Sequence, residues 1–176
     1  MRTLFVAVTL TIAGATASGQ DMPLRDWTKD GEGWTKAAGA RPDRMELAVP
    51  VTVEGLTPTA SVVAGDTLYV GFPDQRHLWA FPLDKEGQPT TGQPYATLRV
   101  PVGAKQPVAV SSLTVDAAGR IYAATPLGVQ VFDPTGRLSG VLALPATGVT
   151  TLLDWEKDEL VAWVGGQKYA RKMNAK

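Results

Sequence analysis

Three side chains have the types that acid–base or nucleophilic chemistry needs: His77, Asp116 and Asp133. His77 is the only histidine, so a serine–histidine–aspartate arrangement would depend on it. The sequence has no Gly-x-Ser-x-Gly segment, which holds the nucleophilic serine in many hydrolases. We therefore interpret His77 as a surface residue at a turn between strands, and we expect no catalytic residue among these three.

The two aspartates each precede a glycine by three residues, Asp116 before Gly119 and Asp133 before Gly136. This spacing is typical of a turn in which the carboxylate accepts hydrogen bonds from backbone N–H groups. The glycine supplies a backbone conformation with positive φ that other residues adopt at a cost. We therefore predict that these four residues have structural roles in turns.

The aspartate–glycine turns lie in a repeating pattern of short strands. The pattern recurs from Leu68 to Ile121 after 53 residues and from Ile121 to Leu160 after 39 residues. A blade of a β-propeller typically takes about 40–45 residues. A loop between Pro89 and Gly103 accounts for the longer first interval. The repeat therefore predicts an all-β chain that forms a partial β-propeller over residues 45–176.

Strand-forming residues predict twelve strands, and hence about three four-stranded blades. The expected ranges are 46–53, 60–64, 67–72, 77–82, 95–100, 108–115, 120–124, 128–133, 137–144, 149–154, 159–164 and 167–173. We expect Trp79, Trp155 and Trp163 in the core between blades.

A closed propeller has about four to eight blades, so three blades leave an open arc. We expect its outward faces to carry apolar residues such as Trp79, Leu142 or Trp163. Exposed apolar area of that size is uncommon on a stable monomer. We therefore expect the chain to pair with itself or with another propeller segment, unless the segment before residue 45 caps the open edge.

The N-terminus has the pattern of a secretory signal peptide over residues 1–19. Arg2 precedes an apolar stretch from Leu4 to Ala13, and small residues follow it. The alternative is an N-terminal membrane anchor. After residue 20 no apolar run is long enough to span a membrane, so we expect a secreted or periplasmic protein.

Residues 20–44 form a polar leader with a short duplication around Trp27 and Trp34. The two tryptophans could contact a glycan or a partner protein. We favour the alternative that they dock on the chain's own domain.

Composition excludes several classes of protein. The 17 basic and 17 acidic residues balance, whereas a nucleic-acid-binding protein usually has a basic excess. The chain has no cysteine, which excludes disulfides, thiolate metal sites and a lipid-modified cysteine. An exported domain of this kind must be held together by burial and hydrogen bonding alone.

One run carries a resemblance to a known family. Residues 113–137, read as LTVDAAGRIYAATPLGVQVFDPTGR, together with the ending QKYARKM, resemble the C-terminal part of the gluconolactonase and senescence-marker-protein (regucalcin) family. Those proteins are six-bladed propellers. The resemblance implies a lactone hydrolase in which a divalent cation, commonly calcium, is held by a glutamate, an asparagine and an aspartate. Such hard oxygen ligands suit calcium.

The sequence departs from the family where this chemistry would occur. Ser111 stands where the family has its aspartate, and the only asparagine is Asn174, close to the C-terminus. Glu54, in a Glu-Gly pair, is the one candidate for the glutamate ligand. The sequence therefore gives no complete metal site, and a calcium cofactor is expected only if the chain is a lactonase.

Three hypotheses about function remain open. The chain is a non-catalytic binding or scaffolding module, a metal-dependent lactonase with an altered site, or a fragment of a longer enzyme of this type. We favour the first, because the metal-ligand positions are the part of the family pattern that is missing.

Overall fold

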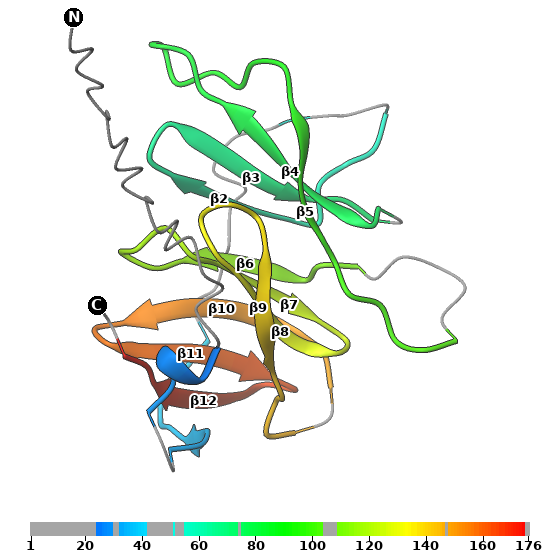
Figure 1. Cartoon of the computed structure of the whole chain (residues 1–176). Helices are drawn as coiled ribbons and strands as arrows, with labels where there is room; N and C mark the ends of the chain where they lie inside the picture. The colour runs from blue at the N-terminus through cyan, green and yellow to red at the C-terminus, as the bar shows by residue number, and fades with distance from the viewer. Residues whose placement is uncertain are drawn as a thin grey trace, which may run out of the picture.

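The computed structural model describes residues 24–29, 32–41, 51, 55–73, 75–103, 109–146 and 148–174. Its strands form three four-stranded antiparallel sheets (Figure 1). The first blade contains β2 (Ala60–Ala64), β3 (Thr67–Gly71), β4 (His77–Pro82) and β5 (Gln93–Thr97). The second contains β6 (Ser112–Val115), β7 (Ile121–Thr125), β8 (Gly128–Phe132) and β9 (Leu138–Leu142). The third contains β10 (Thr150–Glu156), β11 (Glu159–Val164), β12 (Gln167–Lys172) and β1 (Thr35–Lys36).

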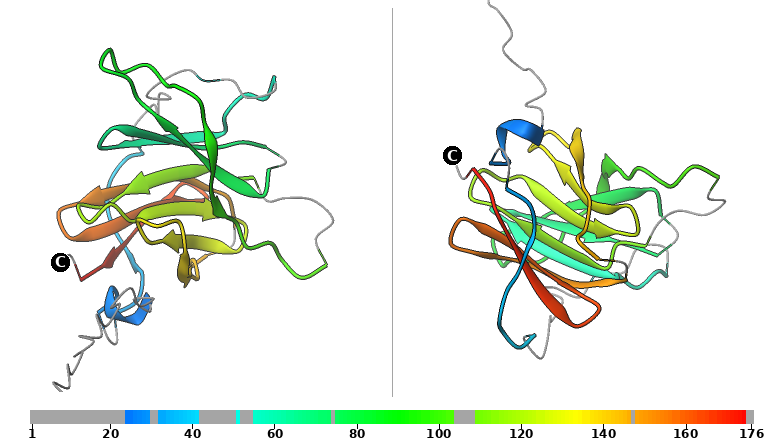
Figure 2. Two further views of the ribbon diagram at one scale, coloured as in Figure 1. Left: turned by 45° about the horizontal axis from the view of Figure 1, so that its top comes forward. Right: turned by 90° about the horizontal axis from the view of Figure 1, so that it is seen from below.

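The three sheets stack face to face as neighbouring blades do (Figures 1 and 2). Each blade begins with its own innermost strand, and β6 contacts both β2 and β10. Strands then follow in chain order from the inside outwards, except that β1 is the outermost strand of the third blade. The predicted all-β architecture of about three blades is therefore confirmed.

The fourth strand of the third blade comes from the N-terminal segment. Thr35 and Lys36 pair with Ala170 and Tyr169 of β12, so β1 covers an edge that would otherwise be open. The predicted strand over 46–53 lies outside the described residues except for Val51, which is not in a strand. Sequence reasoning missed β1, because two exposed polar residues carry no hydrophobic pattern.

Further contacts fasten the N-terminal segment to the second and third blades. Trp27 is 3% exposed and belongs to the cluster of apolar side chains between those blades. Its backbone carbonyl accepts a hydrogen bond from the Asn174 N–H at 2.8 Å. Trp34 donates from its indole Nε1 to the carbonyl of Ala143 at 2.8 Å. The expectation that both tryptophans dock on the domain is therefore confirmed.

Alternating side chains of the strands fill the two interfaces between blades. Between the first and second blades lie buried Leu78, Leu113 and Phe132, among others. Between the second and third blades lie buried Tyr122 and Leu160, among others. Strand residues point alternately to opposite faces, so each sheet contributes one face to each neighbour.

Two expectations placed Trp79 and Trp163 differently, on the outward faces of the end blades and in the core between blades, and the structure agrees with the first. Trp79 and Trp163 lie on these faces, whereas of the three tryptophans only Trp155 packs between blades. Leu142 was expected on an outward face, but it lies buried between the second and third blades. Trp163 is only 2% exposed. Among the described residues, the large apolar side chains that are exposed are Val102 and Val149.

Residues of the connection between β1 and β2 pack against these outward faces. Ala37 contacts the cluster that contains Trp163, and Val51 and Leu56 belong to or pack against the cluster beside Trp79. The N-terminal part of the chain thus contributes to both ends of the arc. No helix in the described part of the chain has the length and apolar character needed to cross a membrane.

Candidate functional site

The first candidate site is a hollow where the innermost strands of the second and third blades begin. Its volume is about 250 Å³. Ser111 precedes β6, Thr125 ends β7 and Thr150 begins β10, and all three side chains line it. Its other lining residues are Ala109, Pro126, Gly148 and Val149.

The three hydroxyl groups of this hollow differ in how they are bonded. Thr125 donates to the Gly128 carbonyl at 2.9 Å and accepts from the Gln130 side chain at 3.2 Å. Ser111 reaches the Ala124 carbonyl only at 3.4 Å. The Thr150 hydroxyl is buried and has no partner in the described structure. Buried polar groups are normally hydrogen-bonded, so we expect the Thr150 hydroxyl to bond to a water or to a ligand atom.

None of the described residues that line this hollow is ionisable. Calcium takes six to eight oxygen ligands, several of them usually carboxylates. Within the described residues, no group of three or more histidine, cysteine, aspartate or glutamate side chains could hold a metal ion. Glu54, the candidate glutamate ligand, lies outside the described residues. The hollow as described can offer a ligand hydroxyl and backbone groups.

A second hollow of about 390 Å³ adjoins the first. The two share Pro126 and Gly148 as walls, and the second continues outward to Leu144 and Ala146. Together they form a continuous uncharged surface at this edge of the second blade.

Asp116 lies at the opposite end of β6, in the turn that leads to β7. Its Oδ1 atom accepts hydrogen bonds from the backbone N–H groups of Ala118 and Arg120, both at 3.0 Å. Its Oδ2 atom accepts from the Tyr122 hydroxyl at 3.0 Å and from Arg120 Nε. Gly119 closes the turn with φ of +78°. Arg120 also stacks on the ring of Trp27, so this turn connects the second blade to the N-terminal segment.

Asp133 has the same arrangement in the turn between β8 and β9. Its Oδ1 atom accepts from the backbone N–H groups of Thr135 and Arg137, at 2.8 and 3.1 Å. Gly136 has φ of +83°, and a Cβ there would lie 2.5 Å from the carbonyl oxygen of Tyr95. At Gly119 the only atom near such a Cβ is 3.8 Å away. The two turns therefore have the same backbone geometry, but only Gly136 faces a close neighbour.

Burial raises the pKa of the Tyr122 hydroxyl above its ordinary value, and the adjacent Asp116 carboxylate raises it further. Tyr122 is fully buried, so its hydroxyl is held as a proton donor to Asp116. The roles of Tyr122 and Arg120 were missed in the sequence, because nothing in their spacing marks them as partners of Asp116.

His77 is the first residue of β4 and pairs with Thr97 across the sheet. In the described part of the chain it has no hydrogen-bonded serine or carboxylate, so the structure brings together no serine–histidine–aspartate arrangement there.

Comparison of the fold with solved structures gives partial matches to propellers. A protein provisionally described as a gluconolactonase matches with a TM-score of 0.55 at 23% identity. A gluconolactonase from Xanthomonas campestris matches with a TM-score of 0.51 at 22% identity. The chain shares its blade fold with gluconolactonases. At this level of identity the likeness concerns the fold alone.

Coverage shows how much of those propellers is present. The matches cover 67% and 61% of this chain but only 39% and 34% of the two gluconolactonase chains. An extracellular domain of a one-component system from B. thetaiotaomicron also matches, with a TM-score of 0.50 at 13% identity, over 73% of this chain and 17% of that domain. No family model matches the chain, and no match was found among curated proteins.

Proposed function

We propose that this chain is an exported, non-catalytic binding or scaffolding module built on three propeller blades. The observation that carries the proposal is the hydroxyl-lined hollow at the start of β6 and β10. It has Ser111 where the resembling enzymes have an aspartate, and none of its lining residues in the described part of the chain is ionisable. A lactonase needs a group that polarises the carbonyl or activates water, and hydroxyls alone are poor at both.

A ligand of this hollow would be uncharged and polar. The unpartnered Thr150 hydroxyl and the weakly bonded Ser111 hydroxyl are the two groups free to contact it. The adjoining uncharged surface toward Leu144 would receive the rest of such a ligand.

The alternative function is that of a metal-dependent lactonase, or a fragment of one. The partial coverage of the gluconolactonase chains favours the fragment over the complete enzyme. An assay of the purified chain against a panel of sugar lactones, with and without calcium, separates these proposals. We expect no hydrolysis above the uncatalysed rate. Calcium-dependent hydrolysis that Glu54→Gln abolishes would establish the lactonase instead.

Export rests on the N-terminal pattern of a basic residue, an apolar stretch and small residues. We propose cleavage that leaves a mature N-terminus between Ser18 and Asp21. N-terminal sequencing of the exported protein tests this, and a protein that still begins at Met1 would overturn it.

The partner that the open arc favours is another propeller segment or a second copy of the chain. Three blades are fewer than the four to eight of closed propellers, and closed symmetry is usual for homo-oligomers. Because the described outward faces expose little large apolar surface, we expect this association to be weak rather than obligate.

A further inference from the structure

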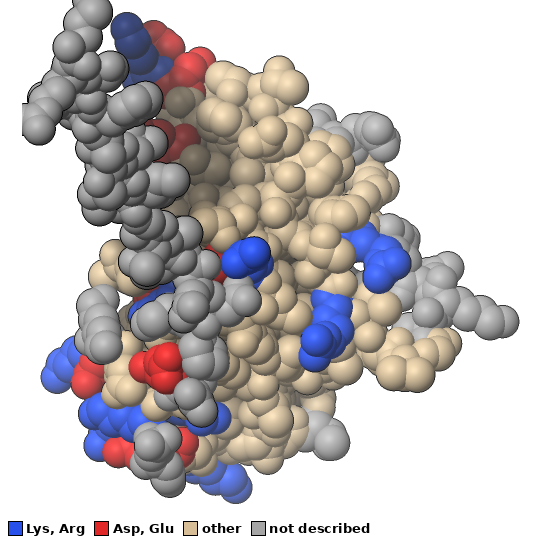
Figure 3. All heavy atoms as spheres, in the orientation of Figure 1, with Lys and Arg blue, Asp and Glu red and all other residues tan. Residues whose placement is uncertain are grey.

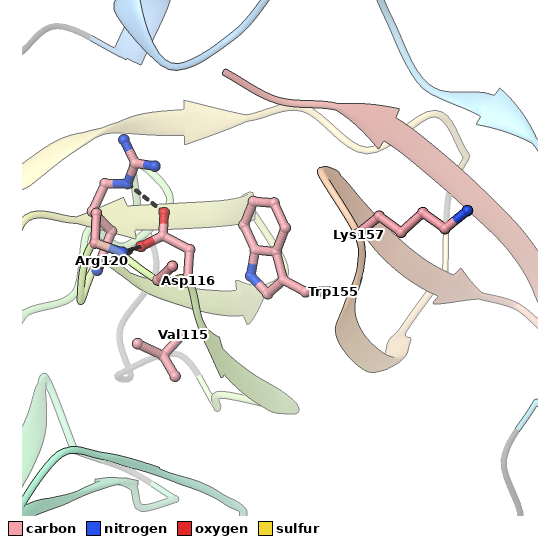
Figure 4. Close-up of a pocket in the computed structure, with 7 residues that line it drawn as sticks. Val115, Asp116, Arg120, Trp155 and Lys157 are labelled. Carbon is pink, nitrogen blue, oxygen red and sulfur yellow. Dashed lines mark hydrogen bonds and ion pairs between the residues drawn. The ribbon is translucent and has the colours of Figure 1, made fainter. Parts of the chain in front are cut away.

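A third hollow lies at the opposite end of the innermost strands from the hydroxyl-lined one. Its volume is about 240 Å³, and its walls include Val115, Asp116, Arg120, Trp155 and Lys157 (Figure 4). Ser111 and Asp116 flank β6 and are five residues apart, which separates this hollow from the hydroxyl-lined one by roughly 16 Å at about 3.3 Å per residue. This third hollow plays no part in the proposed function.

The carboxylate in this hollow has no capacity left for a ligand. Asp116 accepts four hydrogen bonds, two from backbone N–H groups and one each from Arg120 Nε and Tyr122 Oη. Two oxygens of a carboxylate have about four lone-pair sites. Asp116 therefore orients Arg120 and offsets its charge, but it does not offer an acceptor.

Donors in the hollow, by contrast, remain unused. A guanidinium has five N–H donors. The Nε–H of Arg120 donates to Asp116, and the guanidinium also interacts with the Tyr122 hydroxyl; the described residues offer no further acceptor to its remaining N–H groups. Trp155 stands across the hollow from Asp116 and Arg120 (Figure 4). Its indole Nε1 is buried without a partner in the described structure. Buried donors are normally satisfied, so this indole N–H would take its acceptor from a water, from a ligand or from a part of the chain outside the described residues.

The charge of the hollow is positive. Arg120 and Asp116 offset each other, and Lys157 adds one positive charge from the turn between β10 and β11. Figure 4 shows Lys157 on the far side of Trp155 from Asp116, so its ammonium acts at longer range. Lys157 also has φ of +60°, a left-handed conformation that favours glycine, yet a lysine occupies it.

We propose that this hollow binds the carboxylate of a small organic monoanion. Arg120 Nη and Trp155 Nε1 donate to the carboxylate oxygens, because a guanidinium fork matches carboxylate geometry. The indole ring and Val115 contact the apolar body of the ligand. A net charge of one positive unit on the lining residues fits a monoanion better than a doubly charged phosphate.

The test is an NMR titration of the whole mature chain with benzoate, followed at the indole N–H signal of Trp155. The Trp155→Phe variant assigns that signal, because its resonance disappears. We expect a saturable shift with benzoate and none with benzamide, which has the same size without the charge. Absence of a saturable shift, an equal shift with benzamide, or tighter binding of inorganic phosphate would each overturn the proposal.

Variants then locate the site by calorimetry. Trp155→Phe keeps the ring against Tyr122 but removes the donor, and we expect it to weaken benzoate binding about tenfold. Trp79→Phe is the matched control, since its Nε1 is also buried without a partner but lies in the first blade. We expect that control to bind benzoate as the natural chain does. Equal loss in both variants, or in neither, would contradict the assignment.

Lys157→Gly suits the backbone conformation of its turn and so keeps the fold. We expect it to weaken benzoate binding about twofold to threefold, as for an exposed charge at a distance. Lys85→Gly, at an exposed turn of the first blade, is the control of equal charge change and should have no effect. Unchanged binding in Lys157→Gly would remove the lysine from the site.

Discussion

At the scale of single residues, Asp116 shows how one carboxylate can organise a turn and a blade interface together. It holds its own turn through two backbone N–H groups and orients Arg120 and Tyr122 through its second oxygen. Arg120 then stacks on Trp27 of the N-terminal segment. The sequence predicts the turn from the aspartate–glycine spacing. It does not predict the side-chain partners, because these depend on the packing of separate segments.

Tyr122 gives the turn a dependence on alkaline pH. Its pKa in the folded chain is raised, by burial first and by Asp116 second, above the value of about 10 in an unfolded chain. Below pH 10 both states keep the proton and the stability is fully present. Above pH 10 the unfolded state loses its proton first, so the free energy of unfolding falls by about 1.4 kcal/mol per pH unit for this residue.

The variant Tyr122→Phe removes this group from the titration. We expect the natural chain to lose about 1 kcal/mol more than Tyr122→Phe between pH 10 and pH 11, measured by urea unfolding at both pH values. The variant should be less stable at pH 8, since the hydrogen bond to Asp116 is absent. Equal alkaline losses in the two proteins would show that Tyr122 ionises as easily in the fold as out of it.

Substitutions of the two turn glycines, Gly119 and Gly136, distinguish the cost of backbone strain from the cost of a steric clash. Both have positive φ, so Gly119→Val and Gly136→Val should each cost about 1–3 kcal/mol through the backbone. At Gly136 the new Cβ also meets the Tyr95 carbonyl, so we expect this variant to be the less stable of the two. Thermal unfolding of both variants measures the difference. Melting temperatures equal to that of the natural chain would mean that the turns tolerate side chains.

At the scale of elements, the strands were largely predictable. The ranges 60–64, 77–82 and 159–164 agree at both ends with β2, β4 and β11. Their β-branched and aromatic residues and the turns that bound them carry a strong local signal. In contrast, β1 forms because it can pair with the open edge of β12. Such pairing with a distant strand cannot be predicted from the local pattern of residue types in β1.

Docking of the N-terminal segment should contribute strongly to stability. Trp27 is buried between this segment and two blades, and removal of a buried tryptophan side chain typically costs about 3–5 kcal/mol. We therefore expect Trp27→Ala to lower the free energy of unfolding by that amount in denaturant titrations. Trp34→Ala is the matched comparison, since Trp34 is only partly buried, and it should cost less. Equal stability of Trp27→Ala and the natural chain would mean that the segment does not hold the blades together.

At the scale of the whole molecule, the chain is an arc of three blades rather than a ring. The residue pattern predicted the number of blades, because each blade repeats the same turn chemistry. It placed Trp79 and Trp163 on the outward faces correctly, but it placed Leu142 there wrongly and did not predict that Trp163 would be covered. Leu142 belongs to the interface between the second and third blades, and Trp163 is buried in a cluster that Ala37 contacts. Such burial depends on the connection between β1 and β2, whose path a strand pattern does not specify.

Charge is distributed unevenly over this arc. On the face shown in Figure 3, charged side chains of both signs gather around the third blade and at the top of the first blade, and much of the surface between them is uncharged. Mixed signs do not make the continuous basic surface typical of nucleic-acid binding.

Self-association is the prediction that belongs to this scale. Light scattering of the mature chain at micromolar concentrations should show a mass that rises toward twice that of the monomer as concentration increases. A constant monomer mass together with a single cooperative melt would contradict it. In that case the N-terminal segment and its connection to β2 suffice to close the two ends of the arc.

The central claim is that these blades form a binding module without a metal-dependent active site, and calcium titration calorimetry of the mature chain tests it most directly. The account predicts no saturable heat at micromolar to low millimolar calcium, because the described lining of the hydroxyl-lined hollow holds no carboxylate. Micromolar calcium binding that Glu54→Gln abolishes would contradict the account and establish a metal centre.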